Sequence, residues 1–262
     1  MTLLTERRGP ALWLRLDRPQ ALNGLTPELL DELDAGLDKA EADTEIRCVV
    51  LAATGRVFCS GADLKYVRSL LADADTSVER QLGLLHRVGR TVNRIEVFGK
   101  PVLAAVQGKA LAGGLELVLA ADVVIAGRSA AFGDAHANYG LLPGAGASTR
   151  LPARVGRSLA KYLMFTGDPV PAADLTHTDL VTVLVEDDQL EDEVGRIAAR
   201  IAAKSPLGLA RMKALAGDAS DVPISVALRR ELEVSELHLH SYDFREGLAA
   251  FNAKRTPQFI GR

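Results

Sequence analysis

The chain has 262 residues, of which 48% are hydrophobic, and its formal net charge is -3 at pH 7. A chain of this length can bury a sizeable core, either as one large domain or as a domain with a small appendage. No run of Lys and Arg is longer than a pair, so the sequence predicts no nucleic-acid partner. The first ten residues lack the apolar core of a signal peptide, and no apolar run is long enough to span a bilayer. We therefore expect a cytoplasmic globular protein with no membrane partner.

The first part of the chain alternates strand-like and helix-like segments. Residues 11–17 and 46–53 are apolar and indicate strands. Between them, Thr26 is placed to cap a helix that starts at Pro27 and ends near Asp43, with leucines at helical spacing. The segments that follow are expected to be a loop at 54–63, a helix at 64–97 interrupted near 72–77, a strand at 100–108, a helix at 113–120, a strand at 122–127, and a short strand with a long glycine-rich loop at 130–148.

After Gln189 the sequence contains only helical patterns. Three segments with apolar residues spaced by three and four follow one another, with Pro206 and Pro223 near helix starts. The alternation before them predicts a layered α/β fold with largely parallel strands. We therefore expect an α/β core at 1–190 that carries the active site, and a helical region at 191–262 that serves for subunit contact or as a lid.

The cysteines and histidines do not form a metal-binding or nucleophilic pattern. Cys48 and Cys59 lie in apolar segments without repeated spacing, and we interpret them as buried thiols. A nucleophilic role for Cys59 would need a general base, which its own segment does not supply. The five histidines show neither an HExxH motif nor paired Cys/His spacing, so no metal site is predicted.

Two glycine-containing turns are the first candidates for chemistry. CSGADLK (59–65) and ALAGGLE (110–116) each follow a strand and lead into a helix, so their free N–H groups can face one point if the strands are neighbours. Such a pair binds an anion, or a carbonyl oxygen that becomes one. The alternative is two ordinary strand-to-helix turns. Glu116 follows the second turn among core-like residues, where an ionised carboxylate without a partner is costly.

Five segments, in this order and spacing, resemble those of the crotonases, the enoyl-CoA hydratase/isomerase superfamily. They are RPQALNGLT, GRVFCSGADLK, GKALAGGLELVLAAD, FGDAHANYGLLPGAGASTRL and EGLAAFNAKRTPQF. The resemblance covers nearly the whole chain. It implies an α/β fold, a crotonase-like spiral of ββα units with a C-terminal helical trimerisation region, assembled as a homotrimer or a dimer of trimers. It also implies an acyl-CoA thioester as ligand, with coenzyme A as part of the substrate and no separate cofactor.

The resemblance assigns roles to single residues. The backbone N–H groups of Ala62 and Gly113 match the donors of an oxyanion hole, which holds the thioester oxygen while an enolate forms; such donors are each worth roughly 3 to 4 kcal/mol. Glu116 matches the first of two catalytic glutamates, although a structural acid paired with a buried arginine is an alternative. Other matched positions are expected to bind the substrate or its CoA arm: Ala21, Ser60, Gly61, Asp63, Leu64, Lys65, Gly114, Phe251 and Lys254. Lys65 and Lys254 also fit solvated surface charges.

His136 stands where the hydratases of this family carry their second glutamate. A neutral imidazole can accept a hydrogen bond from water or pass a proton near neutral pH, so hydration by a Glu/His pair is chemically possible. Asp134 could orient or charge it, or could lie beside it without contact. Alternatively, His136 satisfies nearby backbone groups.

Three functions follow, of which hydration of a 2-enoyl-CoA by Glu116 and His136 is the first. The second is another crotonase reaction on an acyl-CoA, such as hydrolysis, decarboxylation or isomerisation. The third is a catalytically silent member that binds acyl-CoA or assembles with other enzymes. A simple isomerase fits less well, because family isomerases with one acid usually keep the second carboxylate and lose the first, which is the reverse of the pattern in this chain.

Overall fold

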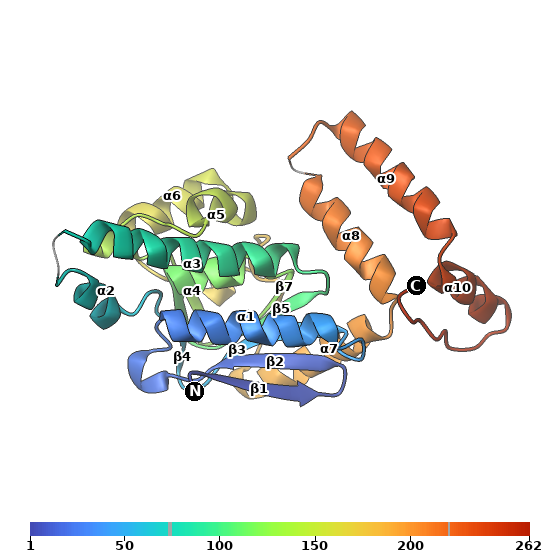
Figure 1. Cartoon of the computed structure of the whole chain (residues 1–262), viewed down its shortest axis with the longest axis horizontal. Coiled ribbons are helices and arrows are strands. Elements are labelled where there is room, and N and C mark those ends of the chain that lie inside the picture. The colour runs from blue at the N-terminus through green and yellow to red at the C-terminus, as the bar shows by residue number, and fades with distance from the viewer. Residues whose placement is uncertain (73–74, 220) are drawn as a thin grey trace.

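The computed structural model describes residues 1–72, 75–219 and 221–262. They form a body of two sheets with covering helices, from which the last three helices project (Figure 1). The larger sheet has the order β1-β2-β3-β5-β7-β10, and only β1 and β2 pair antiparallel. Its strands are β1 (Leu3–Arg8), β2 (Ala11–Leu16), β3 (Cys48–Ala53), β5 (Val102–Val106), β7 (Val123–Gly127) and β10 (Val183–Val185). The predicted α/β class with largely parallel strands is confirmed.

The smaller sheet has the order β4-β6-β8-β9. Its strands are β4 (Val57–Cys59), β6 (Lys109–Leu111), β8 (Ala131–Gly133) and β9 (Val170–Pro171), of which β4, β6 and β8 are parallel. Each of these three follows a strand of the larger sheet and precedes a helix, so the chain repeats a ββα unit. The prediction of a loop at 54–63 is wrong for β4, because a strand of three residues is too short to show an alternating pattern.

The helices of the body agree with the predicted boundaries where the sequence has caps. Helix α1 begins at Pro27, after Thr26, whose hydroxyl accepts a hydrogen bond from the Leu29 N–H, and Asp43 caps its end. The predicted interruption near 72–77 separates α2 from α3; residues 73–74 lie outside the described residues. The helices are α1 (Pro27–Ala42), α2 (Leu64–Leu70), α3 (Ser77–Val97), α4 (Gly113–Leu119), α5 (Ala147–Val155), α6 (Arg157–Thr166) and α7 (Leu190–Ala202). Short 3-10 helices are η1 (Pro19–Ala21), η2 (His136–Tyr139), η3 (Ala172–Leu175) and η4 (Asp187–Gln189).

Both faces of the larger sheet are covered. Helix α7 packs Leu190, Val194 and Ala198 against one face, and α1 packs against β1, β2 and β3 on the other. Every residue of β3 and β5 is therefore buried, which explains their continuous apolar sequences. Helix α4 lies between the smaller sheet, α3 and α5, and all seven of its residues are buried. This burial fixes the position of Glu116 in space.

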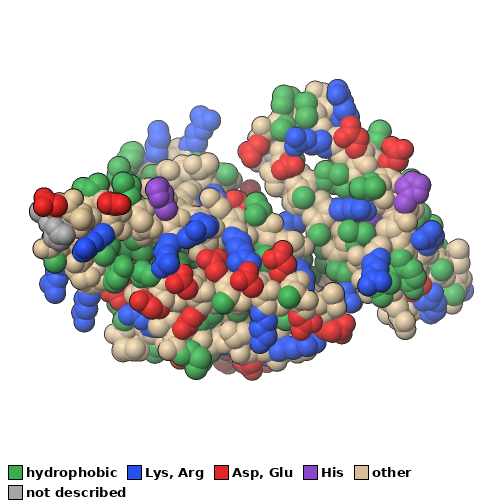
Figure 2. All heavy atoms as spheres, in the orientation of Figure 1, with side chains coloured by type: hydrophobic (Ala, Val, Ile, Leu, Met, Phe, Trp, Pro, Cys, Tyr) green, Lys and Arg blue, Asp and Glu red, His purple; other side chains and the backbone are tan. Residues whose placement is uncertain are grey.

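Three C-terminal helices project from the body: α8 (Pro206–Asp218), α9 (Ile224–Leu239) and α10 (Tyr242–Asn252) (Figure 1). The Lys213 ammonium on α8 binds the Asp122 carboxylate at 2.8 Å, which ties this region to the body. None of the described residues of α9 is buried, and Leu228 and Leu232 are 59% and 69% exposed. Apolar side chains appear on this projecting part in Figure 2. Such a surface suits the expected subunit contact, and the trimer stays a prediction.

No helix among the described residues is both long and apolar enough to cross a membrane.

Candidate active site

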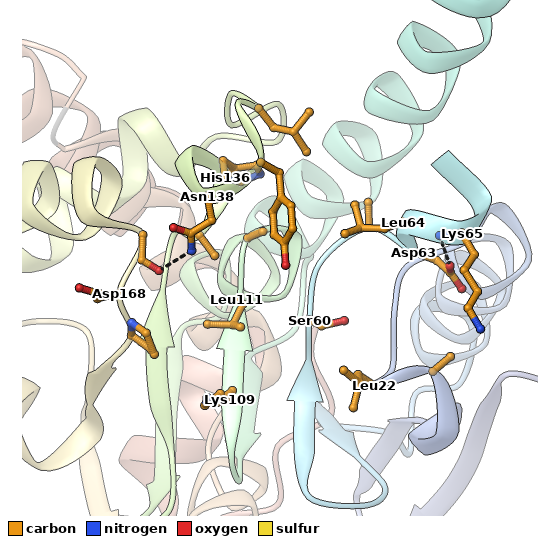
Figure 3. Close-up of a pocket in the computed structure, with 18 of the residues that line it drawn as sticks. Leu22, Ser60, Asp63, Leu64, Lys65, Lys109, Leu111, His136, Asn138 and Asp168 are labelled. Carbon is orange, nitrogen blue, oxygen red and sulfur yellow. Dashed lines mark hydrogen bonds between the residues drawn. The ribbon is translucent and has the colours of Figure 1, made fainter. Parts of the chain in front are cut away.

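A pocket of about 570 Å³ opens where β4, β6 and β8 end (Figure 3). These strands are parallel neighbours, so the segments that follow them meet at one edge of the sheet. The turns after β4 and β6 were expected to face one point only if those strands were neighbours, and the two strands are paired. Among the predicted site residues, those that line the pocket are Ala21, Ser60, Ala62, Asp63, Leu64, Lys65 and His136.

The two turns approach each other so closely that glycine is required. Gly61 has φ +92°, and a Cβ there would lie 2.8 Å from the Ala112 Cβ and 3.1 Å from the Gly113 nitrogen. A Cβ on Gly113 would lie 3.8 Å from the Ala62 nitrogen, and one on Gly114 would lie only 2.4 Å from a backbone oxygen of β4. The glycines therefore let the backbones of Ala62 and Gly113 come together beside the pocket.

The orientation of the two amides follows from their neighbours. Leu25 donates its N–H to the Gly61 carbonyl at 2.8 Å and accepts from the Asp63 N–H at 3.0 Å, so the Ala62 N–H points away from Leu25. Gly113 is the first residue of α4, and its N–H has no acceptor within the helix. Ala112, just before it, has φ 48° and ψ -120°, a conformation that costs an L-residue about 1 to 3 kcal/mol. This conformation of Ala112 sets the direction of the next peptide group, which carries the Gly113 N–H.

Glu116 is held by backbone amides rather than by a cation. Its side chain is buried, and Oε1 accepts hydrogen bonds from the N–H of Ala145 at 2.8 Å and of Ala147 at 3.1 Å. No basic side chain forms an ion pair with it within the described ranges, so the alternative of an acid paired with a buried arginine is wrong. Burial raises the pKa of Glu116 and outweighs the two N–H bonds and the charge of His136, which lower it. A raised pKa suits a group that must accept and release a proton.

The side chains of Asp134 and His136 are in contact, which residues two apart on an extended segment need not be. The Nδ1 atom of His136 lies 3.0 Å from Oδ1 of Asp134, and the same oxygen accepts the His136 backbone N–H at 3.4 Å. Ala135 between them has φ 57° and ψ -7°, a left-handed conformation that bends the chain back. The Nδ1 atom of His136 thus binds a side-chain carboxylate, so the alternative that it satisfies a backbone group is wrong for this atom. Burial lowers the pKa of His136, but the bond and charge of Asp134 and the charge of Glu116 outweigh burial, and the pKa is raised.

Asp63, Gly61 and Gly114 have structural roles in the site. Asp63 caps α2 by accepting from the N–H of Lys65 and Tyr66, and it also binds Arg18 at 2.9 Å. Gly61 and Gly114 act through their lack of a side chain, as described above. Lys65 reaches the pocket at its α2 side, and Figure 3 shows it beyond Asp63.

Gly61, Gly113, Gly114 and Glu116 are not among the residues that line the pocket, and two further predicted site residues lie far from it. Phe251 is 82% exposed on α10, and Lys254 follows that helix with φ 52°. Helix α10 and the start of α2 lie at opposite ends of the molecule in Figure 1. Within one protomer these residues do not contribute to the site, so their predicted contact with CoA requires a second copy of the chain and stays a prediction.

Several residues of the site were not predicted from the sequence. Ala145 and Ala147 supply the amides that bind Glu116, and Lys109, Asn138 and Asp168 line the pocket. The glycine-rich stretch around Ala145 was a usable signal, because free amides in such a loop need an acceptor.

The cysteines are buried thiols, as predicted. Burial raises the pKa of both Cys48 and Cys59 to about 12, which leaves them unreactive. Among the described residues, no three His, Cys, Asp or Glu side chains gather as a metal-binding group.

Comparisons with known proteins match the geometry. Residues 8–262 match the family described as Enoyl-CoA hydratase/isomerase. The 2,3-dehydroadipyl-CoA hydratase of Escherichia coli is 35% identical over 261 residues, which cover 99% of each chain. The 1,2-epoxyphenylacetyl-CoA isomerase of Escherichia coli is 35% identical over 265 residues, which cover 99% of this chain and 98% of that one. The crystal structure of enoyl-CoA hydratase from Bacillus anthracis superposes with a TM-score of 0.94 at 31% identity and covers 100% of both chains.

Fold, pocket and relatives together define an acyl-CoA-processing enzyme of the crotonase type. The family predicted from the five sequence segments is confirmed: the chain belongs to the enoyl-CoA hydratase/isomerase family. A hydratase and an isomerase are equally similar to it at 35% identity, so identity alone does not select the reaction.

Proposed function

We propose that the protein adds water to the double bond of a 2-enoyl-CoA. The observation that carries this proposal is that backbone amides hold the Glu116 carboxylate. Two backbone amides hold its Oε1, which leaves Oε2 as the oxygen for a water molecule, and its charge acts on His136. A carboxylate fixed in this way is preorganised as a general base.

The proposed reaction uses three groups of the site. Glu116 takes a proton from water as the hydroxyl adds to the β-carbon of the substrate. The electrons of the double bond move toward the thioester, whose oxygen becomes negative and is held by the N–H groups of Ala62 and Gly113. His136 then gives the proton on its Nε2 to the α-carbon, and the proton on Glu116 passes through solvent to His136, which returns both groups to their starting states. A general base and a general acid of this kind each contribute about 100-fold to 10,000-fold in rate.

The CoA arm is proposed to lie along the η1 and α2 side of the pocket. Lys65 lines this side, and its ammonium suits a phosphate of the nucleotide. The exposed Phe251 and Lys254 of a second copy are proposed to close the adenine end, in a trimer or a pair of trimers. This arrangement gives the exposed C-terminal helices a function in the site as well as in assembly.

Hydration is tested by following the absorbance of the enoyl thioester with short and medium 2-enoyl-CoA substrates. The native protein should remove the absorbance, and Glu116→Gln should lower kcat at least about a hundredfold with little change in CoA affinity. No hydration by native protein that binds CoA normally would overturn the proposal. Retained turnover in Glu116→Gln would show that the acid is structural.

The Asp134–His136 contact favours a second candidate, hydrolysis of the thioester. A histidine held through Nδ1 by a buried carboxylate can activate water at its Nε2, and the oxyanion amides would stabilise the tetrahedral intermediate. Water would replace CoA at the carbonyl carbon, and the proton taken up by His136 would pass to the departing thiolate. Release of thiol from a saturated acyl-CoA tests this reaction, because a saturated chain has no double bond to hydrate.

A further inference from the structure

The turn that binds Glu116 is flexible by composition. Gly144 and Gly146 flank Ala145, and Gly146 has φ +104°, which an L-residue rarely adopts. A backbone of this kind has many accessible conformations, and only some of them point the N–H of Ala145 and Ala147 at the carboxylate. Contacts from outside the turn must therefore select the conformation that binds Glu116.

Arg150, in the first turn of α5, supplies such a contact. Its Nη1 donates to the Ala145 carbonyl at 2.8 Å, while the Ala145 N–H donates to Glu116 at 2.8 Å. The rest of the guanidinium is anchored on α3. Nε and Nη2 bind the two carboxylate oxygens of Glu96 at 2.9 and 2.5 Å, and Nη2 binds the Asn93 side chain at 2.7 Å. Only 15% of the Arg150 side chain is exposed, and its bond to the Ala145 carbonyl is partly buried, whereas the bonds to Glu96 and Asn93 lie at the surface.

We infer that Arg150 is a positioning residue for Glu116, which holds the 144–147 turn so that its amides face the carboxylate. The inference deepens the proposed function, because it rests on Glu116 as the general base. The guanidinium links α3 to the turn, and the peptide of Ala145 links the turn to Glu116. Arg150 thus acts through the backbone and need not touch the substrate.

Protonation of Glu116 reports whether the turn is in place. Burial raises its pKa and the amides of Ala145 and Ala147 lower it, so a turn that moves away should raise the pKa further. The other titratable groups that act on Glu116 are His136, whose charge lowers its pKa, and Asp134, whose charge raises it. Loss of Arg150 also leaves the Glu96 carboxylate unpaired, so a variant that keeps the positive charge is needed to separate the effect of the turn from that of charge.

The test is an infrared titration of protein carrying 13C-labelled glutamate, in which the Glu116 band is identified by its loss in Glu116→Gln. Arg150→Met should move the titration midpoint of Glu116 to higher pH. Arg150→Lys keeps the charge but lacks the planar fork, so it should move the midpoint the same way by less. Arg94→Met is the matched control, because Arg94 is an arginine of α3 itself and binds Asp34 and Asp38 of α1 instead of the turn.

Kinetics supply a second readout. In Arg150→Met, kcat should fall about tenfold near neutral pH with KM nearly unchanged, and should recover as the pH is raised. Loss of folded protein would not recover in this way. If no hydratase activity exists, the proposed function fails while the infrared titration still tests Arg150. An unchanged Glu116 midpoint in folded Arg150→Met or Arg150→Lys protein would overturn the inference.

Discussion

Asp134 and His136 are in contact through their side chains, with Nδ1 of the imidazole 3.0 Å from Oδ1 of the carboxylate. The carboxylate is 1% exposed, and its Oδ2 has no hydrogen-bond partner among the described residues. A buried carboxylate that lacks part of its hydrogen bonding attracts a cation strongly, and the imidazolium form of His136 is the cation within reach. The pair therefore favours a protonated His136 at the pocket, which is the form that can donate a proton.

We expect Asp134→Asn to remove this preference. The pKa of His136 should fall, because the carboxylate that raises it is gone. If His136 donates a proton, the descending limb of the pH profile of kcat/KM should move to lower pH, and kcat near neutral pH should drop roughly tenfold or more. The measurement is hydration as a function of pH; if the native protein instead releases thiol, with His136 as the base, the ascending limb should move to lower pH.

A matched control for this variant is Asn138→Ala. Asn138 also lines the pocket near His136, but its Nδ2 donates to the Gly167 carbonyl rather than to the imidazole. We expect this variant to leave the descending limb where it is. The same shift in both variants would mean that the loop containing His136 has moved, and would contradict a specific effect of Asp134.

Restoring the glutamate of the family at position 136 gives a second prediction. In His136→Glu the new carboxylate would lie beside the Asp134 carboxylate, and two buried like charges in contact repel each other. We expect the single variant to be less active than native protein. The double variant His136→Glu with Asp134→Asn should hydrate faster than the single one, because the amide can donate to the new carboxylate. A double-mutant cycle measures this coupling, and additive effects would contradict it.

The pH dependence of stability follows from the raised pKa values of Glu116 and His136. A group whose pKa is higher in the folded than in the unfolded state stabilises the fold at low pH, and this stabilisation is lost as the pH rises through the folded pKa. For Glu116 this stabilisation is lost as the pH rises above the range in which an ordinary glutamate titrates. We expect Glu116→Gln to gain stability relative to native protein when the pH is raised from a value within the ordinary glutamate range to neutral pH.

Denaturant unfolding at the two pH values measures this difference. Glu96→Gln is a control with the opposite sign, because Arg150 lowers the pKa of Glu96 and its contribution is lost as the pH falls. This variant should therefore lose more stability at the higher pH. If Glu116→Gln showed the pH trend of Glu96→Gln, a raised pKa of Glu116 in the folded protein would be ruled out.

The sequence allowed much of the fold to be predicted because many of its signals are local. Thr26 and Pro27 mark a helix start by themselves, and buried strands such as β3 appear as continuous apolar runs. The strands β4 and β6 were missed because each has only three residues. The two strands pair with each other, although about fifty residues separate them in the sequence. Short strands are defined by their neighbours and not by their own pattern.

In the site, too, features with a local signal could be predicted and contacts between distant residues could not. Glu116 and His136 could be identified from the sequence, since a carboxylate in an apolar helix and a departure from a family motif are visible there. The amides that hold Glu116 belong to residues 29 and 31 positions away, and sequence spacing gives no information on such a contact. The Asp134–His136 contact depends on the left-handed conformation of Ala135, and an alanine in the sequence does not predict that conformation.

The exposed face of α9 provides the last prediction. Leu228 and Leu232 lie one helical turn apart and are both largely exposed, so they form part of one apolar stripe. If this stripe packs against another copy, Leu232→Glu would bury a charge in the contact and should convert the assembly into smaller species by sedimentation velocity. Glu231→Lys, a charge change at the neighbouring position, is the control and should leave the assembly intact. A native protein that sediments as a monomer would contradict the expected trimer, and with it the proposed contribution of Phe251 and Lys254 to a neighbouring pocket.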